Sequence, residues 1–263
     1  MRNWSACLPA PRPLTTGRLI RGVVIWVGLA VALLLLLRYD LTLMQWRCLW
    51  LSEEPTGEFR RWIQTLRDFG QPPPMIIVSI AILLVDRRRW LFVAMLIVAQ
   101  LAAAVVYNPV KWYVPRYRPP AFIAEVARSG TTDEDLGAEA GDEALYGPEY
   151  AELFGARRPE QTWLFGQPRN RATRYESFPS GHSAGAFVFA TVLAWFYPRL
   201  RWLVFALAAG CAASRFVNGV HWASDCLAGA MVGYCAAWLT LRPYVWPLAG
   251  RWMGGKSRSA LKS

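Results

Sequence analysis

The chain contains only two histidines, His182 and His221, and their surroundings point to chemistry. Asp225 follows His221 by four positions and is the single acidic residue between Ser177 and the C-terminus. If a helix begins near Val220, the two side chains lie on one face of it. The carboxylate would then accept the proton of one ring nitrogen and leave the other nitrogen able to attack. We interpret His221 as a nucleophile oriented by Asp225, and a helix-end pair that only satisfies hydrogen bonds is the alternative.

The second histidine belongs to a stretch suited to an anion, Phe178-Pro179-Ser180-Gly181-His182-Ser183, which immediately precedes an apolar run. Ser180 or Ser183 can cap the helix that begins here, and its first backbone N–H groups attract negative charge. Gly181 lets the backbone approach a bound oxyanion closely. His182 at this edge can give a proton to a leaving oxygen. A purely structural helix start would need similar residues.

Three cations are expected near the same membrane face. Lys111 and Arg118 are seven positions apart, about two helical turns, so both can face one point if the helix continues through Pro115. Arg215 adds a forked guanidinium suited to phosphate oxygens. Each of these alone is an ordinary cation at a membrane edge. Together with the two histidines and the helix start, they predict a binding site for a phosphate group.

The elements that would carry these residues are apolar helices. Of the 263 residues, 54% are hydrophobic and the mean hydropathy is +0.20, which favours insertion in a bilayer. Six apolar segments stand out: 22–37, 75–85, 90–107, 183–197, 202–213 and 226–241. A span needs about 20 residues, so several segments must include flanking residues, and 75–85 is the weakest of the six, with a core helix as the alternative. We predict an all-α fold, an integral membrane bundle of six transmembrane helices with a long extracytoplasmic loop between the third and fourth.

The basic residues of the short connections predict the orientation, because they prefer the cytoplasm. They occur in the N-terminal segment, in the turns Asp86–Arg89 and Pro198–Arg201, and in the C-terminal tail. The regions 108–182 and 214–221 therefore face outward together. The net charge of +11 sits at the ends of apolar segments rather than on one dense patch, which argues against nucleic-acid binding. The five cysteines are odd in number and lack CxxC spacing, so neither a disulfide framework nor a metal site is expected.

We divide the chain into a cytoplasmic N-terminal segment, 1–18, a membrane domain, 19–242, and a basic cytoplasmic tail, 243–263. Within the membrane domain, 119–177 is rich in acidic residues and is predicted to be an extracytoplasmic loop or lid. A solvated loop and a lid whose basic, aromatic end meets lipid headgroups both fit. Between Glu58 and Phe69, apolar residues at helical spacing predict an amphipathic helix that lies in the membrane interface or packs on protein.

With these motifs the sequence resembles the type 2 phosphatidic acid phosphatase superfamily, which also contains glucose-6-phosphatase and the vanadium haloperoxidases. The signature K-x6-RP, PSGH and SR-x5-H-x3-D reads here as Lys111–Pro119, Pro179–His182 and Ser214–Asp225. The resemblance implies six transmembrane helices with the site at one membrane face and no metal cofactor. It implies that His221 attacks phosphorus, Asp225 orients it and His182 protonates the leaving group. It further implies a group of residues that hold the phosphoryl oxygens: Lys111, Arg118, Ser180, Gly181 and Arg215.

The expected function is that of a lipid phosphatase of a bacterial-type inner membrane, with its site on the periplasmic or extracytoplasmic side. Its partners would be the bilayer and a lipid phosphomonoester or pyrophosphate, with undecaprenyl pyrophosphate preferred. Alternatives are lipid A, phosphatidylglycerol phosphate, and phosphate transfer to a lipid acceptor. Vanadate-dependent haloperoxidation uses similar motifs on soluble proteins, and the six apolar segments weigh against it. A transporter or scaffold whose polar residues line a pathway is the non-enzyme alternative, and the oligomeric state is open.

Overall fold

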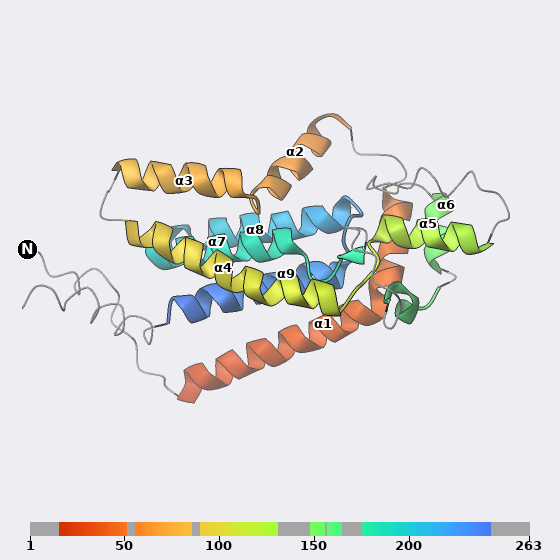
Figure 1. The fold of residues 1–263 in the computed structure, drawn as a ribbon, viewed down its shortest axis with the longest axis horizontal. Helices are drawn as coiled ribbons and strands as arrows, with labels where there is room; N and C mark the ends of the chain where they lie inside the picture. Colours follow the sequence, from red (N-terminus) through yellow and green to blue (C-terminus); the bar gives the residue numbers. More distant parts are fainter. Residues whose placement is uncertain are drawn as a thin grey trace, which may run out of the picture. The chain divides into compact units, whose positions relative to one another are not determined.

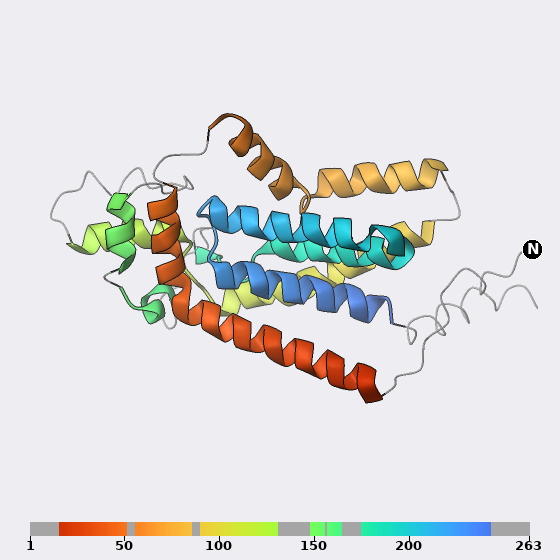
Figure 2. The same ribbon diagram turned by 180° about the vertical axis from the view of Figure 1, so that it is seen from behind.

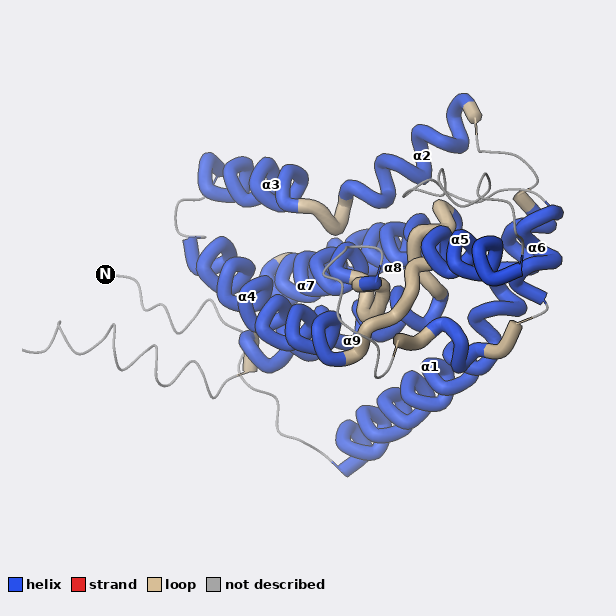
Figure 3. Tube along the Cα trace, turned by 45° about the vertical axis from the view of Figure 1, so that its right-hand side comes forward, coloured by secondary structure: helices blue, strands red, loops and turns tan. Residues whose placement is uncertain are grey.

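The computed structural model describes residues 16–51, 56–85, 90–130, 148–155, 157–164 and 175–242. The chain divides into two compact units, Met1–Ala32 with Leu241–Ser263, and Leu33–Thr240. The contacts reported below lie within the second unit. Helices and loops make up the described residues, which contain no strand (Figure 3). The all-helical fold predicted from the sequence is therefore confirmed.

Each of the six predicted apolar segments corresponds to a helix, and only the last residues of 183–197 and 226–241 lie beyond the helix end. These helices are α1 (Thr16–Trp50), α3 (Pro72–Val85), α4 (Trp90–Tyr113), α7 (Gly181–Phe196), α8 (Arg201–Val217) and α9 (Ala223–Thr240). Among the described residues, three stretches are long and apolar enough to cross a membrane, namely Ile20–Trp50, Trp90–Tyr113 and Pro198–Val217. A fourth candidate is the pair of α2 (Gly57–Asp68) and α3, which is bent by 66°. By length and composition the described helices thus support three or four spans, fewer than the six predicted.

Helix α7 packs against α4, α8 and α9, which run beside it in both ribbon views (Figures 1 and 2). Almost all of its side chains between Ser183 and Leu193 are buried. On α9, a Cβ at Gly229 or Gly233 would collide with the backbone of α7, so the two glycines allow the helix axes to approach closely. This packing brings the start of α7 beside the start of α9, where the backbone N–H of Ser180 donates to the carbonyl of Asp225 at 3.0 Å.

The amphipathic helix predicted between Glu58 and Phe69 corresponds to α2. Its apolar face is turned toward α8, and Ile63 on that face is buried. Trp62 remains 65% exposed and Phe59 47% exposed. Of the two placements considered, packing against α8 accounts for the buried part of the apolar face of α2, and Phe59 and Trp62 remain exposed.

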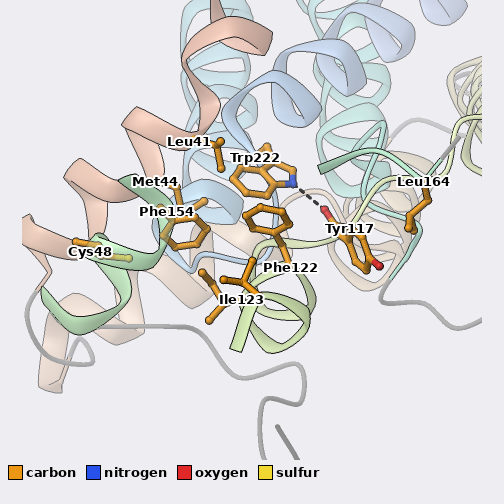
Figure 4. Close-up of a cluster of buried hydrophobic side chains, with 11 residues drawn as sticks. Leu41, Met44, Cys48, Tyr117, Phe122, Ile123, Phe154, Leu164 and Trp222 are labelled. Atoms are coloured by element: carbon orange, nitrogen blue, oxygen red, sulfur yellow. Dashed lines mark hydrogen bonds between the residues drawn. The ribbon is translucent and has the colours of Figure 1, made fainter. Parts of the chain in front are cut away.

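The segment 119–177, which the sequence predicts to be a loop or lid, contains three short helices among its described residues. These are α5 (Pro119–Gly130), α6 (Pro148–Gly155) and the 3-10 helix η4 (Pro159–Thr162), together called the cap below. They fold because their apolar side chains share one hydrophobic cluster with the end of α1 (Figure 4). Phe122, Phe154 and Trp222 lie at its centre, with ring centroids 5.9 to 6.3 Å apart. The indole N–H of Trp222 also donates to the carbonyl of Tyr117 at 2.7 Å, so the cap is anchored directly beside His221.

Candidate active site

The turn that carries His221 is held by a buried arginine of α1. Arg47 is 1% exposed, and its Nε donates to the carbonyl of Val217 at 2.8 Å, at the end of α8. Gly219 follows with φ +67°, a conformation that glycine adopts without strain. A Cβ at this position would lie 2.9 Å from the guanidinium carbon of Arg47. The cation and the glycine together fix the path of the chain into His221.

His221 and Asp225 face each other in the interior, as the spacing predicted. The distance from His221 Nδ1 to Asp225 Oδ2 is 3.6 Å, and the two side chains are 2% and 0% exposed. The same oxygen accepts the Ser177 hydroxyl at 2.5 Å and the backbone N–H of Trp222 at 3.1 Å. Helix α9 begins at Ala223 rather than near Val220, so His221 precedes the helix, and Asp225 reaches back to it from the first turn. Because the carboxylate faces Nδ1, Nε2 is the nitrogen directed away from it.

An arginine that the sequence reasoning did not assign completes the surroundings of Asp225. Arg116 is fully buried, and its Nη1 donates to Asp225 Oδ1 and to the Ser224 hydroxyl, both at 2.7 Å. Its Nη2 forms a 2.7 Å ion pair with Asp40 of α1, which also accepts from the backbone and hydroxyl of Ser224. The guanidinium carbon lies 4.5 Å from the ring centroid of Trp163. One cation thus balances two buried carboxylates, either of which would be costly alone.

Arg116 is placed by an extended segment that connects α4 to α5. Its N–H donates to the carbonyl of Tyr175 at 3.0 Å, and its carbonyl accepts from the N–H of Ser177 at 3.2 Å. On the other side of the segment, the N–H of Leu164 donates to the carbonyl of Pro115 at 3.1 Å. Helix α4 ends at Tyr113, before Pro115, so the continuous helix considered for Lys111 and Arg118 is not what joins them. Backbone pairing with the ends of the cap segment positions this stretch instead.

The start of α7 is built as the sequence predicted. Ser180 is the N-cap, and its hydroxyl accepts from the backbone N–H of Ser183 at 3.4 Å. Gly181 opens the helix, and a Cβ there would lie 3.9 Å from Lys111 Nζ. The ammonium group of α4 is therefore beside the backbone of the anion-binding turn. His182 follows, with its side chain at the same end of the helix.

Charge interactions connect the remaining residues into one cluster. His182 is within electrostatic range of Lys111, Arg215 and His221. Lys111 interacts in the same way with Arg118 and Asp225, and Arg215 interacts with Arg118. The structure thus brings together the eight predicted site residues. Arg67 of α2 is an additional cation that acts on His182 and Arg215, and the sequence analysis missed it because α2 carries no motif.

Two properties of the cluster bear on its chemistry. Burial lowers the pKa of His221 to about 4, against an ordinary value of 6.5, although Asp225 opposes the shift. The ring is therefore neutral and nucleophilic at neutral pH. Arg215 has a buried Nε that meets no hydrogen-bond acceptor in the described part of the chain. A phosphoryl oxygen would satisfy such a donor, so the cluster can bind a phosphate group and attack its phosphorus.

Comparison with known families matches residues 90–247 to the PAP2 superfamily. A lipid A 1-phosphatase of Porphyromonas gingivalis is 45% identical over 85 residues, which cover 31% of this chain and 19% of that protein. A lipid A 1-phosphatase of Rhizobium johnstonii is 32% identical over 114 residues, covering 37% and 47%. The matched region is thus less than half the length of each of these relatives.

Two solved structures are also similar. LpxE of Aquifex aeolicus is 20% identical, and the match covers 72% of this chain and 89% of that one with a TM-score of 0.44. The first transmembrane PAP2 type phosphatidylglycerolphosphate phosphatase from Bacillus subtilis is 17% identical, covering 81% and 92% with a TM-score of 0.46.

Proposed function

The chain belongs to the PAP2 superfamily, and from this membership we propose that it is a membrane enzyme that hydrolyses a lipid phosphate through a phosphohistidine intermediate. The observation that carries the proposal is the buried pair of His221 and Asp225, surrounded by Lys111, Arg118 and Arg215. A neutral nucleophile among cations suits attack on an anionic phosphoryl group, because the cations neutralise charge that would repel the attack.

In the first step, the three cations and the N–H groups at the start of α7 hold the phosphoryl oxygens. Nε2 of His221 attacks phosphorus in line, and the bond from phosphorus to the lipid oxygen breaks. His182 gives its proton to that oxygen, since the bound phosphate's negative charge favours the protonated ring. Asp225 keeps the proton on Nδ1 of His221 and stabilises the positive charge of the phosphorylated ring. In the second step, His182 takes a proton from water, the oxygen of that water attacks phosphorus, and the bond to Nε2 breaks.

We place the site at the outward face of the membrane. The turn between α7 and α8 contains the 3-10 helix η6 (Pro198–Leu200) and exposes Arg199 and Arg201, which favour the cytoplasm. His182 and Arg215 lie at the opposite ends of the same two helices. The proposal keeps the six spans and the boundaries 1–18, 19–242 and 243–263. Most residues of the other basic connections used for the orientation lie outside the described residues, and Arg18 and Arg242 are the exceptions.

For the substrate we favour the 1-phosphate of a lipid A-type glycolipid, because two relatives that share the matched region carry the name lipid A 1-phosphatase. Undecaprenyl pyrophosphate, the substrate preferred from the sequence, has no comparable support and becomes the comparison substrate. The test is phosphate release from each purified lipid by the protein in detergent, with and without EDTA. We expect release from the glycolipid, no loss with EDTA, and none from His221→Ala. Activity in that variant equal to wild type would refute the mechanism.

Product analysis with an added acceptor lipid separates hydrolysis from phosphate transfer. Hydrolysis predicts inorganic phosphate as the product whether or not the acceptor is present. A phosphorylated acceptor would instead identify a phosphotransferase that uses the same histidine. A transporter or scaffold would release no phosphate from any lipid.

A further inference from the structure

The cap contains a cavity of about 310 Å³ that the catalytic mechanism does not use. It is lined by Tyr117, Phe122, Glu125, Val126, Arg157, Gln161, Trp163 and Leu164. Its volume is at the lower end of the range for small-molecule sites, about 300–1,000 Å³, which leaves room for one or two small rings. All the lining residues come from α5, η4 and the segments that flank them, outside the candidate membrane spans.

Aromatic rings and polar groups alternate around this cavity. Tyr117 and Phe122 are buried, and Trp163 is partly buried, so three aromatic side chains form its walls. Glu125 and Gln161 are exposed at its edge. The Nε of Arg157 is buried and meets no hydrogen-bond acceptor among the described residues. The carboxylate of Glu125 can accept hydrogen bonds, and the guanidinium of Arg157 and the amide of Gln161 can donate them. A ligand hydroxyl group can pair with either kind because it both donates and accepts.

The chemistry of this lining selects among ligands. An acyl chain would leave the buried N–H of Arg157 unsatisfied, which is costly. A phosphate alone would not use the aromatic walls, and Glu125 would repel it. A sugar ring satisfies both features, because its C–H faces pack on aromatic rings while its hydroxyls meet the polar groups at the edge.

Residues that line the cavity contact or adjoin residues next to the phosphate site. The ring of Trp163 lies 4.5 Å from the guanidinium carbon of Arg116, which binds Asp225. The same ring is 5.5 Å from that of Phe178, which immediately precedes the Pro179–His182 motif. Tyr117, on another wall, is followed directly by Arg118. A headgroup seated in the cavity would therefore be next to a phosphate held by the cations.

We propose that this cavity binds the sugar headgroup of the lipid whose phosphate is removed, so that the substrate class is a phosphorylated glycolipid. The inference rests on the proposed phosphatase function and adds a specificity site to it. Arg157 donates to the sugar, and the aromatic walls favour lipids that carry a sugar ring beside the phosphate. A simple polyprenyl pyrophosphate would leave the cavity empty.

The test compares Arg157→Gln with the matched control Arg158→Gln in the full chain. Arg158 is the neighbouring residue, is exposed and does not line the cavity. The value of kcat/KM is measured on lipid A bearing a 1-phosphate, on phosphatidylglycerol phosphate and on dioleoyl phosphatidic acid, which has no headgroup. Loss of the guanidinium, with its buried Nε donor, at residue 157 is expected to lower kcat/KM on the glycolipid about tenfold and to leave the value on phosphatidic acid unchanged. The control is expected to change neither.

A second variant, Glu125→Gln, removes the acceptor charge at the edge of the cavity and is expected to act on the same substrate alone. An equal loss on all three lipids, or no loss on any, would overturn the sugar site. So would a loss on phosphatidylglycerol phosphate as large as that on the glycolipid, because the cavity would then recognise glycerol. If the wild-type protein releases phosphate from none of the lipids, the proposed function itself fails.

Discussion

Arg116 and Asp40 form a fully buried ion pair, with 2.7 Å between Nη2 and Oδ2, and this pair connects helix α1 to the carboxylate that faces His221. The other guanidinium nitrogen binds Asp225, also at 2.7 Å. Asp40 and Ser224 further share a backbone and a hydroxyl hydrogen bond. The carboxylate of Asp225 is therefore held by α1 through Arg116 as well as by its own helix.

Replacing Arg116 with Gln is expected to leave two buried carboxylates without a counter-charge. Breaking a buried ion pair costs about 3–5 kcal/mol, so thermal unfolding in detergent should occur at a markedly lower temperature. The milder variant Asp40→Asn keeps the shape of the side chain and should lower kcat while KM stays close to that of the wild type. An unchanged kcat in a folded Asp40→Asn protein would show that the α1 pair does not position Asp225.

Arg215 provides a second test. Its Nε is buried and meets no hydrogen-bond acceptor among the described residues, and its charge acts on His221. Arg215→Lys keeps a positive charge but loses the forked geometry that meets two phosphoryl oxygens. We expect kcat to fall about 10²–10³-fold, the usual effect of removing one donor to a transition-state oxyanion. The matched control is Arg199→Lys, at an exposed arginine on the turn between α7 and α8. Equal activity of the two variants would contradict the phosphate-binding role.

The pH dependence follows from the burial of His221. Only the neutral ring attacks, so protonation ends activity, and burial has moved the pKa of the ring from 6.5 to about 4. The acid limb of kcat/KM should therefore lie well below pH 6.5. Because the unfolded chain binds this proton more readily, the contribution of His221 to stability is lost as pH falls from 6.5 toward 4. Unfolding must be followed alongside activity, and an acid limb at pH 6.5 in a folded protein would contradict the buried neutral nucleophile.

The role of His182 predicts that the two steps can be separated. His182→Ala lacks the acid for the first step, and a substrate with a good leaving group such as para-nitrophenyl phosphate does not need one. The variant also lacks the base for the second step. We expect a burst of nitrophenol followed by a turnover rate at least about 10²-fold below that of the wild type. A steady rate without a burst would place His182 outside the second step.

The sequence predicted the parts of the site that depend on local spacing. Ser180 caps the helix that follows it, and Asp225 in the first turn of α9 faces His221 just before that helix, so both features come from residues close together in the sequence. It did not reveal Asp40 and Arg116, which are 76 positions apart, because no local pattern encodes an ion pair between distant segments. Asp40 could have been recognised as a candidate for a buried ion pair, because it is an acidic residue just beyond an apolar run. The helices of the cap were not predicted because their short apolar stretches are stabilised by packing on α1 and Trp222, which are distant in the sequence.

The most direct test of the central claim is to locate the phosphate on the enzyme. The His182→Ala protein is mixed briefly with para-nitrophenyl phosphate, quenched at alkaline pH to preserve the N–P bond, and digested for mass spectrometry. The mechanism predicts one phosphate per chain on the peptide that contains His221, and none on the same peptide of a His182→Ala/His221→Ala protein. A phosphate on any other residue, or an active enzyme that never carries one, would contradict His221 as the nucleophile.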